Sequence, residues 1–188
     1  GFNIFEEREN TDNETIISSF NSIFDTELRF NDQWKLSSQV GIQWDQSSQE
    51  QYVGENTFNM RNIREDSSYD ENQYIVPKGG MHTVNNATTS QITWKVQGEY
   101  KNTFNDIHDI QIMAGSEIRK NWYNTQFTAG YGYDPKTLTT KPLNIRNDKD
   151  AEKYKLHTKT YQENAFASFY TTGSYSFMSR YTIGGSVR

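Results

Sequence analysis

The segment Trp34-Lys-Leu-Ser-Ser-Gln-Val-Gly-Ile-Gln-Trp-Asp45 alternates between apolar and polar side chains along its length. All its apolar residues stand at even-numbered positions, with a tryptophan near each end. Alternation with a period of two predicts a long β-strand with one apolar and one polar face. Strands of soluble domains usually have about 5–6 residues, whereas a strand that crosses a bilayer needs roughly 9–11 and carries aromatic residues at each interface. The segment therefore favours a membrane-crossing strand.

The same alternation recurs along the chain and predicts six strands. They cover about residues 16–30, 34–46, 90–101, 108–120, 164–177 and 181–188. In four of them the charges fall on one face only, whereas Phe166 and Tyr170 weaken the pattern in the last pair because they fall on the polar face. We expect antiparallel strands that pair in chain order.

The predicted connections alternate between short turns and long polar segments. The short turns are residues 31–33, 102–107 and 178–180, and the long segments are about 46–89 and 121–163. Outer-membrane barrels have this rhythm, with short periplasmic turns and long extracellular loops. Six aromatic residues flank the short turns and would form the periplasmic girdle: Phe30, Trp34, Tyr100, Phe104, Phe177 and Tyr181. The predicted fold is an all-β, antiparallel up-and-down transmembrane β-barrel segment.

The composition agrees with a barrel wall. Only 33% of the 188 residues are hydrophobic, which would usually indicate disorder, but 14% are aromatic, which argues against it. A barrel strand reconciles the two values because it needs an apolar residue only at every second position. No run of about 18 apolar residues is present, so we expect no transmembrane helix. Because membrane barrels have at least about eight strands and no signal peptide is visible, we expect residues 1–188 to be part of a larger barrel domain, without its plug.

Other kinds of chemistry find little support in the sequence. The net charge is −5 with both signs mixed, unlike the basic surface of a nucleic-acid-binding protein. The chain has no cysteine, and its three histidines lack the spacing of metal ligands. The run with Asp148, Asp150 and Glu152 lacks the glycine and the terminal glutamate of a calcium loop, so we expect a solvated loop. We expect no enzymatic activity, no metal and no cofactor.

Four aromatic residues in the second long segment are the candidate substrate-binding residues: Trp122, Tyr123, Tyr131 and Tyr133. Flat aromatic rings suit the apolar face of a sugar or a peptide side chain, and loops on a rigid scaffold commonly carry recognition. The alternative is that the stretch from Gly130 to Tyr133 is a structural turn near the ends of the strands.

Charged residues on the polar faces of the strands are predicted to face the barrel lumen. They are Lys35, Asp45, Lys95, Glu99, Glu117 and Arg119. They either line water or contact a plug domain. We favour plug contact, because a polar wall against a polar plug needs matched hydrogen-bonding partners.

Two stretches in the second half of the chain resemble a known family. The first comprises His108–Lys120, Ala129–Thr139 and Lys141-Pro142, and the second comprises Glu163–Phe169, Tyr175–Phe177, Arg180–Ile183 and Ser186–Arg188. In this order they resemble the barrel of SusC/RagA-like TonB-dependent outer-membrane proteins of the Bacteroidetes type. In that family a strand that begins with His and ends in Ala-Gly-x-Glu precedes a Gly-Tyr-Asp-Pro loop. The first half of the chain resembles the family by strand pattern only.

The resemblance implies a barrel of about 22 strands in the lipid of a bacterial outer membrane, with a plug in its lumen. It implies a SusD-like surface lipoprotein as a lid, and the TonB complex as a partner through an N-terminal region missing here. The imported substrates would be glycans, oligosaccharides or peptides. Two other interpretations stay open. One is a soluble β-rich extracellular carbohydrate-binding or adhesin domain, and the other is a barrel segment held as a client of an outer-membrane assembly or secretion machine.

Overall fold

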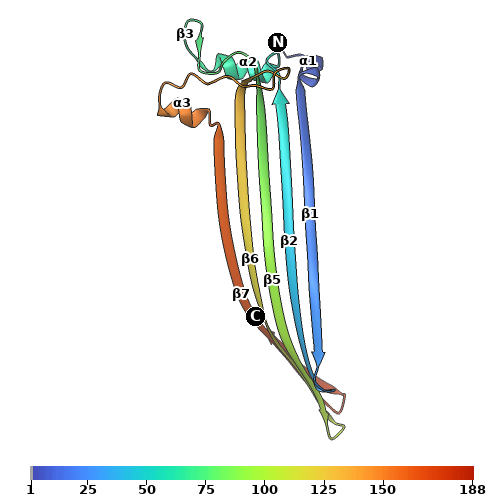
Figure 1. The fold of residues 1–188 in the computed structure, drawn as a ribbon. Coiled ribbons are helices and arrows are strands. Elements are labelled where there is room, and N and C mark those ends of the chain that lie inside the picture. The colour runs from blue at the N-terminus through green and yellow to red at the C-terminus, as the bar shows by residue number, and fades with distance from the viewer. Residues whose placement is uncertain (1) are drawn as a thin grey trace. The chain divides into compact units, whose positions relative to one another are not determined.

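The computed structural model describes residues 2–188, which form one large antiparallel sheet, one small hairpin and three short helices (Figure 1). The large sheet has six strands in the order β1-β2-β5-β6-β7-β8. Their bounds are β1 Thr11–Arg29, β2 Trp34–Val53, β5 Gly80–Phe104, β6 His108–Tyr133, β7 His157–Phe177 and β8 Tyr181–Val187. The helices are α1 Ile4–Glu9, α2 Phe58–Glu65 and α3 Asp148–Lys153, and β3 Ser68–Asp70 pairs with β4 Gln73–Tyr74. The predicted all-β, up-and-down antiparallel fold and the predicted strand order are confirmed.

The strands are longer than the sequence pattern predicts. The segments expected as loops at 46–89 and 121–163 shrink to residues 54–79 and 134–156, because β2, β5, β6 and β7 extend into them. These shorter connections contain α2, β3, β4 and α3, so that the run with Asp148 and Asp150 is helical and not a loop. The polar stretch 46–51 shows why the pattern fails: backbone hydrogen bonds hold a strand in its sheet even where both faces are polar.

The hairpin turns explain how the register of the long strands is fixed. Two turns contain consecutive residues with left-handed backbones, which is the signature of a type I′ turn that matches the twist of its strands. These residues are Asn105 (φ 51°), Asp106 (φ 58°), Met178 (φ 55°) and Ser179 (φ 54°). In the turn between β1 and β2, the Asn31 side-chain oxygen accepts hydrogen bonds from the backbone N–H groups of Gln33 and Trp34.

The chain divides into two compact units. The first comprises residues 1–18, 46–88 and 124–161, and the second comprises residues 19–45, 89–123 and 162–188. Within residues 2–188 every buried hydrophobic residue belongs to the first unit: Val53, Met60, Ile75, Val76, Ala129 and Tyr154. The first unit is therefore organised around a small protein core, as in a soluble domain.

Hydrogen bonds pin the connections of the first unit onto this core. The Thr57 hydroxyl caps α2 by accepting a hydrogen bond from the backbone N–H of Met60, whose side chain is buried. The Ser67 hydroxyl accepts from the N–H of Val76 at 3.2 Å, and the Ser67 carbonyl accepts from the N–H of Ile75 at 2.9 Å. The stretch from α2 to β5 is thus held by both apolar packing and buried hydrogen bonds.

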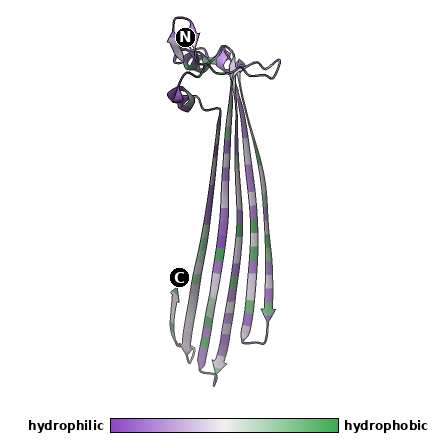
Figure 2. Cartoon of the chain, turned by 60° about the vertical axis from the view of Figure 1, so that its left-hand side comes forward, coloured by the Kyte–Doolittle hydropathy of each residue, from purple (hydrophilic) through white to green (hydrophobic). Residues whose placement is uncertain are grey.

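The strands of the second unit carry apolar side chains that no other part of that unit covers. Most fall on the face that the sequence pattern predicts to be apolar, and Figure 2 shows the alternation along these strands. They include Phe20, Phe24, Leu28, Trp34, Ile42, Trp44, Ile92, Trp94, Ile112, Ile118, Phe169 and Ile183, all exposed. Ile23 and Phe166 are exceptions, exposed on the face predicted to be polar. Within residues 2–188, no helix is long and apolar enough to cross a membrane.

Candidate functional site

The polar face of the second unit brings charges of neighbouring strands together. The Lys35 ammonium lies 2.9 Å from a Glu27 carboxylate oxygen and 3.9 Å from one of Glu99. The Arg119 guanidinium contacts the Glu117 carboxylate at 2.7 Å. The predicted polar face therefore carries ion pairs both between neighbouring strands and along a single strand.

The two other predicted lumen residues also have partners on the sheet. Asp45 accepts a hydrogen bond from the Gln43 amide at 2.6 Å. The Lys95 ammonium lies 5.7 Å from the centre of the Tyr170 ring, and the Tyr170 hydroxyl donates to the Gln97 amide oxygen at 3.1 Å. Contact of these charges with a plug domain stays a prediction.

The four candidate aromatic residues are divided between the two units and have different surroundings. Trp122 and Tyr123 belong to the second unit and are consecutive on β6, so their side chains point to opposite faces of the sheet. The Lys120 ammonium lies 5.1 Å from the centre of the Trp122 ring and pairs with Glu163. Trp122 is thus half-buried beside an ion pair, whereas Tyr123 is exposed.

Tyr131 and Tyr133 belong to the first unit, where they contact different partners. Tyr133 stacks on the His82 ring at 4.8 Å and meets the edge of Tyr52 at 5.6 Å. Tyr131 packs edge-on against Tyr154 at 6.1 Å, at the margin of the buried core. Burial in the first place, and the neighbouring Tyr154 in the second, raise the pKa of the Tyr131 phenol. Tyr131 therefore packs at the margin of the core, and Tyr133 is part of an aromatic cluster, while substrate binding by either residue stays a prediction.

A hollow of about 590 Å³ lies beside this cluster in the first unit, and we name it the strand-end hollow. Its lining includes Tyr52, Glu55, Lys78, Tyr133, Lys136 and Lys141. Its floor is formed where two backbones approach closely: a Cβ atom on Gly79 would lie 2.6 Å from the Gly132 carbonyl carbon. Gly132 also has a left-handed φ of 61°. Two glycines thus allow the end of β6 to touch the segment before β5.

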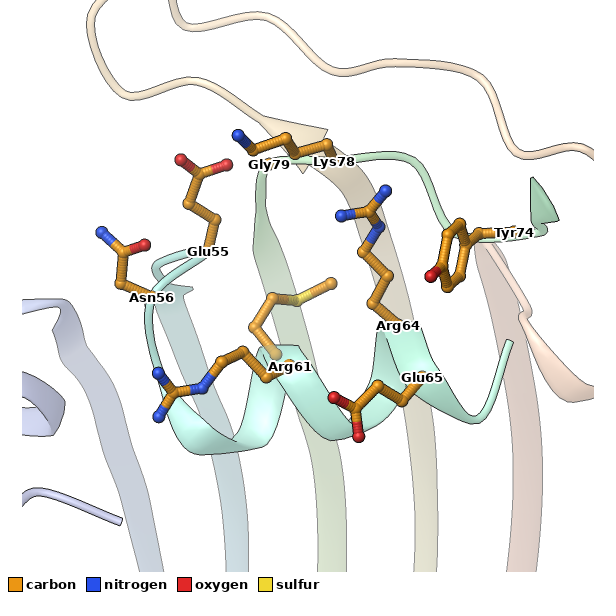
Figure 3. A pocket seen from close by; sticks show the side chains of 9 residues that line it. Glu55, Asn56, Arg61, Arg64, Glu65, Tyr74, Lys78 and Gly79 are labelled. Carbon is orange, nitrogen blue, oxygen red and sulfur yellow. The ribbon is translucent and has the colours of Figure 1, made fainter. Parts of the chain in front are cut away.

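A second hollow of about 280 Å³ lies between α2 and the segment before β5, and we name it the helix hollow (Figure 3). It is lined by Glu55, Asn56, Met60, Arg61, Arg64, Glu65, Tyr74, Lys78 and Gly79. The Arg64 guanidinium lies 4.4 Å from the centre of the Tyr74 ring. Glu55, Asn56, Lys78 and Gly79 line both hollows, so the two are adjacent along the same wall.

Sequence reasoning missed the helix hollow. Its charged residues are single side chains from a short helix and from a turn, and no spacing along the chain connects them. One usable signal was Thr57, a favoured N-cap residue that directly precedes α2. Within residues 2–188, no three His, Cys, Asp or Glu residues gather as a metal site would require.

Comparisons with known proteins give structural matches only. No family model and no curated protein matches the sequence. The fold is similar to a chain of the RagAB peptide transporter, with a TM-score of 0.72 and 14% identity over 95% of this chain. It is similar to chains of the RagAB peptide importer in the "closed-closed" state, with the same values, and in the "open-open" state, with a TM-score of 0.73 and 15% identity.

This chain spans 18% of the length of each of those matching chains. At such low identity the likeness concerns the fold. The six-stranded antiparallel up-and-down sheet has the fold of a segment of an all-β barrel.

Proposed function

We propose that this chain is part of the barrel wall of a TonB-dependent outer-membrane importer. The observation that carries the proposal is the second unit, whose strands expose one regular apolar face and pair their charges on the other. Exposed apolar side chains at every second position are stable when lipid covers them, whereas in water they would promote aggregation. The fold likeness to a peptide transporter supports the same conclusion.

The lengths of the strands favour a membrane position for the second unit only. The five long strands have 19 to 26 residues, whereas roughly 9–11 suffice to cross the hydrocarbon layer. Trp34 and Trp44 bracket a stretch of suitable length on β2 within the second unit, in which apolar and polar residues alternate. The first unit, with its own core and polar hollows, would then stand in water and meet ligands or a lid.

Peptides are the substrates we propose, because the similar structures are peptide importers. A SusD-like surface lipoprotein would close the barrel, and the TonB complex would energise import through a plug region outside this sequence. The wall would bind and guide its cargo without chemical conversion. The aromatic cluster of Tyr52, His82 and Tyr133 favours oligosaccharides as a second candidate, because sugar faces pack on aromatic rings.

The test uses the full-length protein in its own cell envelope. We expect it in the outer-membrane fraction, soluble only with detergent, and with a gel mobility that changes on boiling, as folded barrels show. Uptake of a labelled peptide mixture should stop in cells that lack TonB, whereas a labelled oligosaccharide mixture tests the second candidate. A full-length protein that is soluble without detergent, or uptake that is independent of TonB, would contradict the proposal.

A further inference from the structure

We propose that the helix hollow, defined above, binds an acidic side chain of an oligopeptide, with Arg64 as the main anion-binding group. This inference rests on the proposed importer function and names the ligand chemistry of one site within it. It starts from the charges of the hollow: three cationic residues against two acidic ones line about 280 Å³ of space. The cations are Arg61, Arg64 and Lys78, and the acids are Glu55 and Glu65.

Arg64 is held in place but not neutralised. It projects from the last turn of α2 over the Tyr74 ring, which orients its guanidinium. Its Nε atom is buried and has no hydrogen-bond acceptor in the part of the chain that the structure describes. No carboxylate among residues 2–188 forms an ion pair with Arg64. A planar guanidinium whose Nε–H has no acceptor suits a carboxylate, which can accept two hydrogen bonds side by side.

The surroundings strengthen the attraction for an anion. Figure 3 shows Arg64 rising from α2 toward the segment that carries Lys78. The Lys141 ammonium donates to the Lys78 carbonyl at 2.9 Å, which fixes that segment and adds another positive charge nearby. The buried Met60 anchors the opposite side through α2. The segments that carry Arg64 and Lys78 are therefore held in place before a ligand binds, so that binding needs little further ordering of the protein.

The other side of the hollow suits a peptide chain. Glu55 and Asn56 stand apart from Arg64, in the turn before α2 (Figure 3). Their oxygens can accept hydrogen bonds from backbone N–H groups of a peptide whose acidic side chain contacts Arg64. Both residues also line the strand-end hollow, so an extended peptide can run from one hollow into the other.

The experiment measures binding of two synthetic peptides to the full-length protein in detergent, by calorimetry. The peptides are identical except that one has glutamate where the other has glutamine. We expect tighter binding of the glutamate peptide, with an affinity that falls as salt rises. Arg64→Gln should weaken binding of that peptide about tenfold or more, the size of a lost charge-assisted hydrogen bond. Binding of the glutamine peptide should change little.

Two further variants keep the result interpretable. Lys149→Gln removes one positive charge from α3 in the same unit, outside the lining of the hollow, and should change neither affinity. Lys78→Glu reverses a charge inside the hollow and should shift the preference toward the glutamine peptide. Unchanged mobility on unboiled gels shows that each variant remains folded.

The possible results separate a failure of this inference from a failure of the proposed function. Equal losses for both peptides in Arg64→Gln would mean that Arg64 only supports the fold, and would overturn the inference. So would an acidic oligosaccharide that binds through Arg64 while neither peptide binds. If TonB-dependent peptide uptake is normal but insensitive to these variants, the inference alone fails. If the full-length protein is soluble without detergent, or its uptake is independent of TonB, both the proposed function and this inference fail.

Discussion

Val40 and Gln39 are neighbours on β2 that should respond in opposite ways to the same substitution. They lie between Trp34 and Trp44, near the middle of the stretch that we propose to cross the bilayer. Successive residues of a strand point to opposite faces. Val40 shares its face with the two tryptophans, whereas the Gln39 amide donates to the Asp25 carboxylate at 2.7 Å on the polar face.

The expected magnitude follows from these positions. An arginine on the lipid face near the bilayer midplane costs roughly 2–4 kcal/mol. At about 1.4 kcal/mol for each factor of ten, Val40→Arg should lower the folding equilibrium constant roughly 30- to 700-fold. In Gln39→Arg the guanidinium lies beside Asp25 in a wet environment, and the change should remain within about 0.5 kcal/mol. Val40→Ala is the control for lost packing without added charge.

The assay is reversible folding of the full-length protein into lipid vesicles, followed by tryptophan fluorescence across a urea series. We expect Val40→Arg to shift the midpoint strongly, Val40→Ala to shift it slightly, and Gln39→Arg to leave it near the parent value. Equal shifts for the two arginine variants would refute the assignment of the faces, and with it the membrane position of the second unit.

Three other substitutions test the packing. Gly132→Ala should destabilise the first unit by about 1–3 kcal/mol in urea titrations, because a Cβ would lie 2.8 Å from that of Lys141 on a left-handed backbone. Met60→Ala should cost about 2–5 kcal/mol and expose residues 54–79 to protease, because it empties a buried site; unchanged cleavage would contradict this core. Tyr170→Phe removes the hydrogen bond to Gln97 and should cost about 0.5–1.5 kcal/mol in the same vesicle assay.

The fold could be predicted from the sequence where side-chain chemistry marks the faces of a strand. The alternation around Trp34 to Asp45 is such a case, and the short turn at 178–180 matches the hairpin between β7 and β8. The prediction failed where strands have two polar faces, as in residues 46–51, because pairing there depends on backbone groups that every sequence has. The helices were missed because six to eight residues give too few turns for a periodic signal.

The candidate site was harder to predict than the fold. Aromatic residues close in sequence were predicted to bind substrate together, but strand geometry separates Trp122 from Tyr123, and Tyr133 lies against His82 from β5. One local sequence signal for α3 was present, because Asn147 is a favoured N-cap residue. In the structure its side chain accepts a hydrogen bond from the N–H of Asp150. The partners of Arg64 come from segments that only the folded connections bring together.

The two units use apolar residues in different ways, and this difference supports the functional proposal. In the first unit apolar side chains such as Met60 and Val76 are buried by the protein itself. In the second unit residues such as Trp94 and Ile112 stay exposed while the charges of the opposite face pair with one another. A soluble adhesin would need to bury the second set against another sheet. A lipid-covered wall needs no such partner, and it leaves the polar hollows of the first unit to carry recognition.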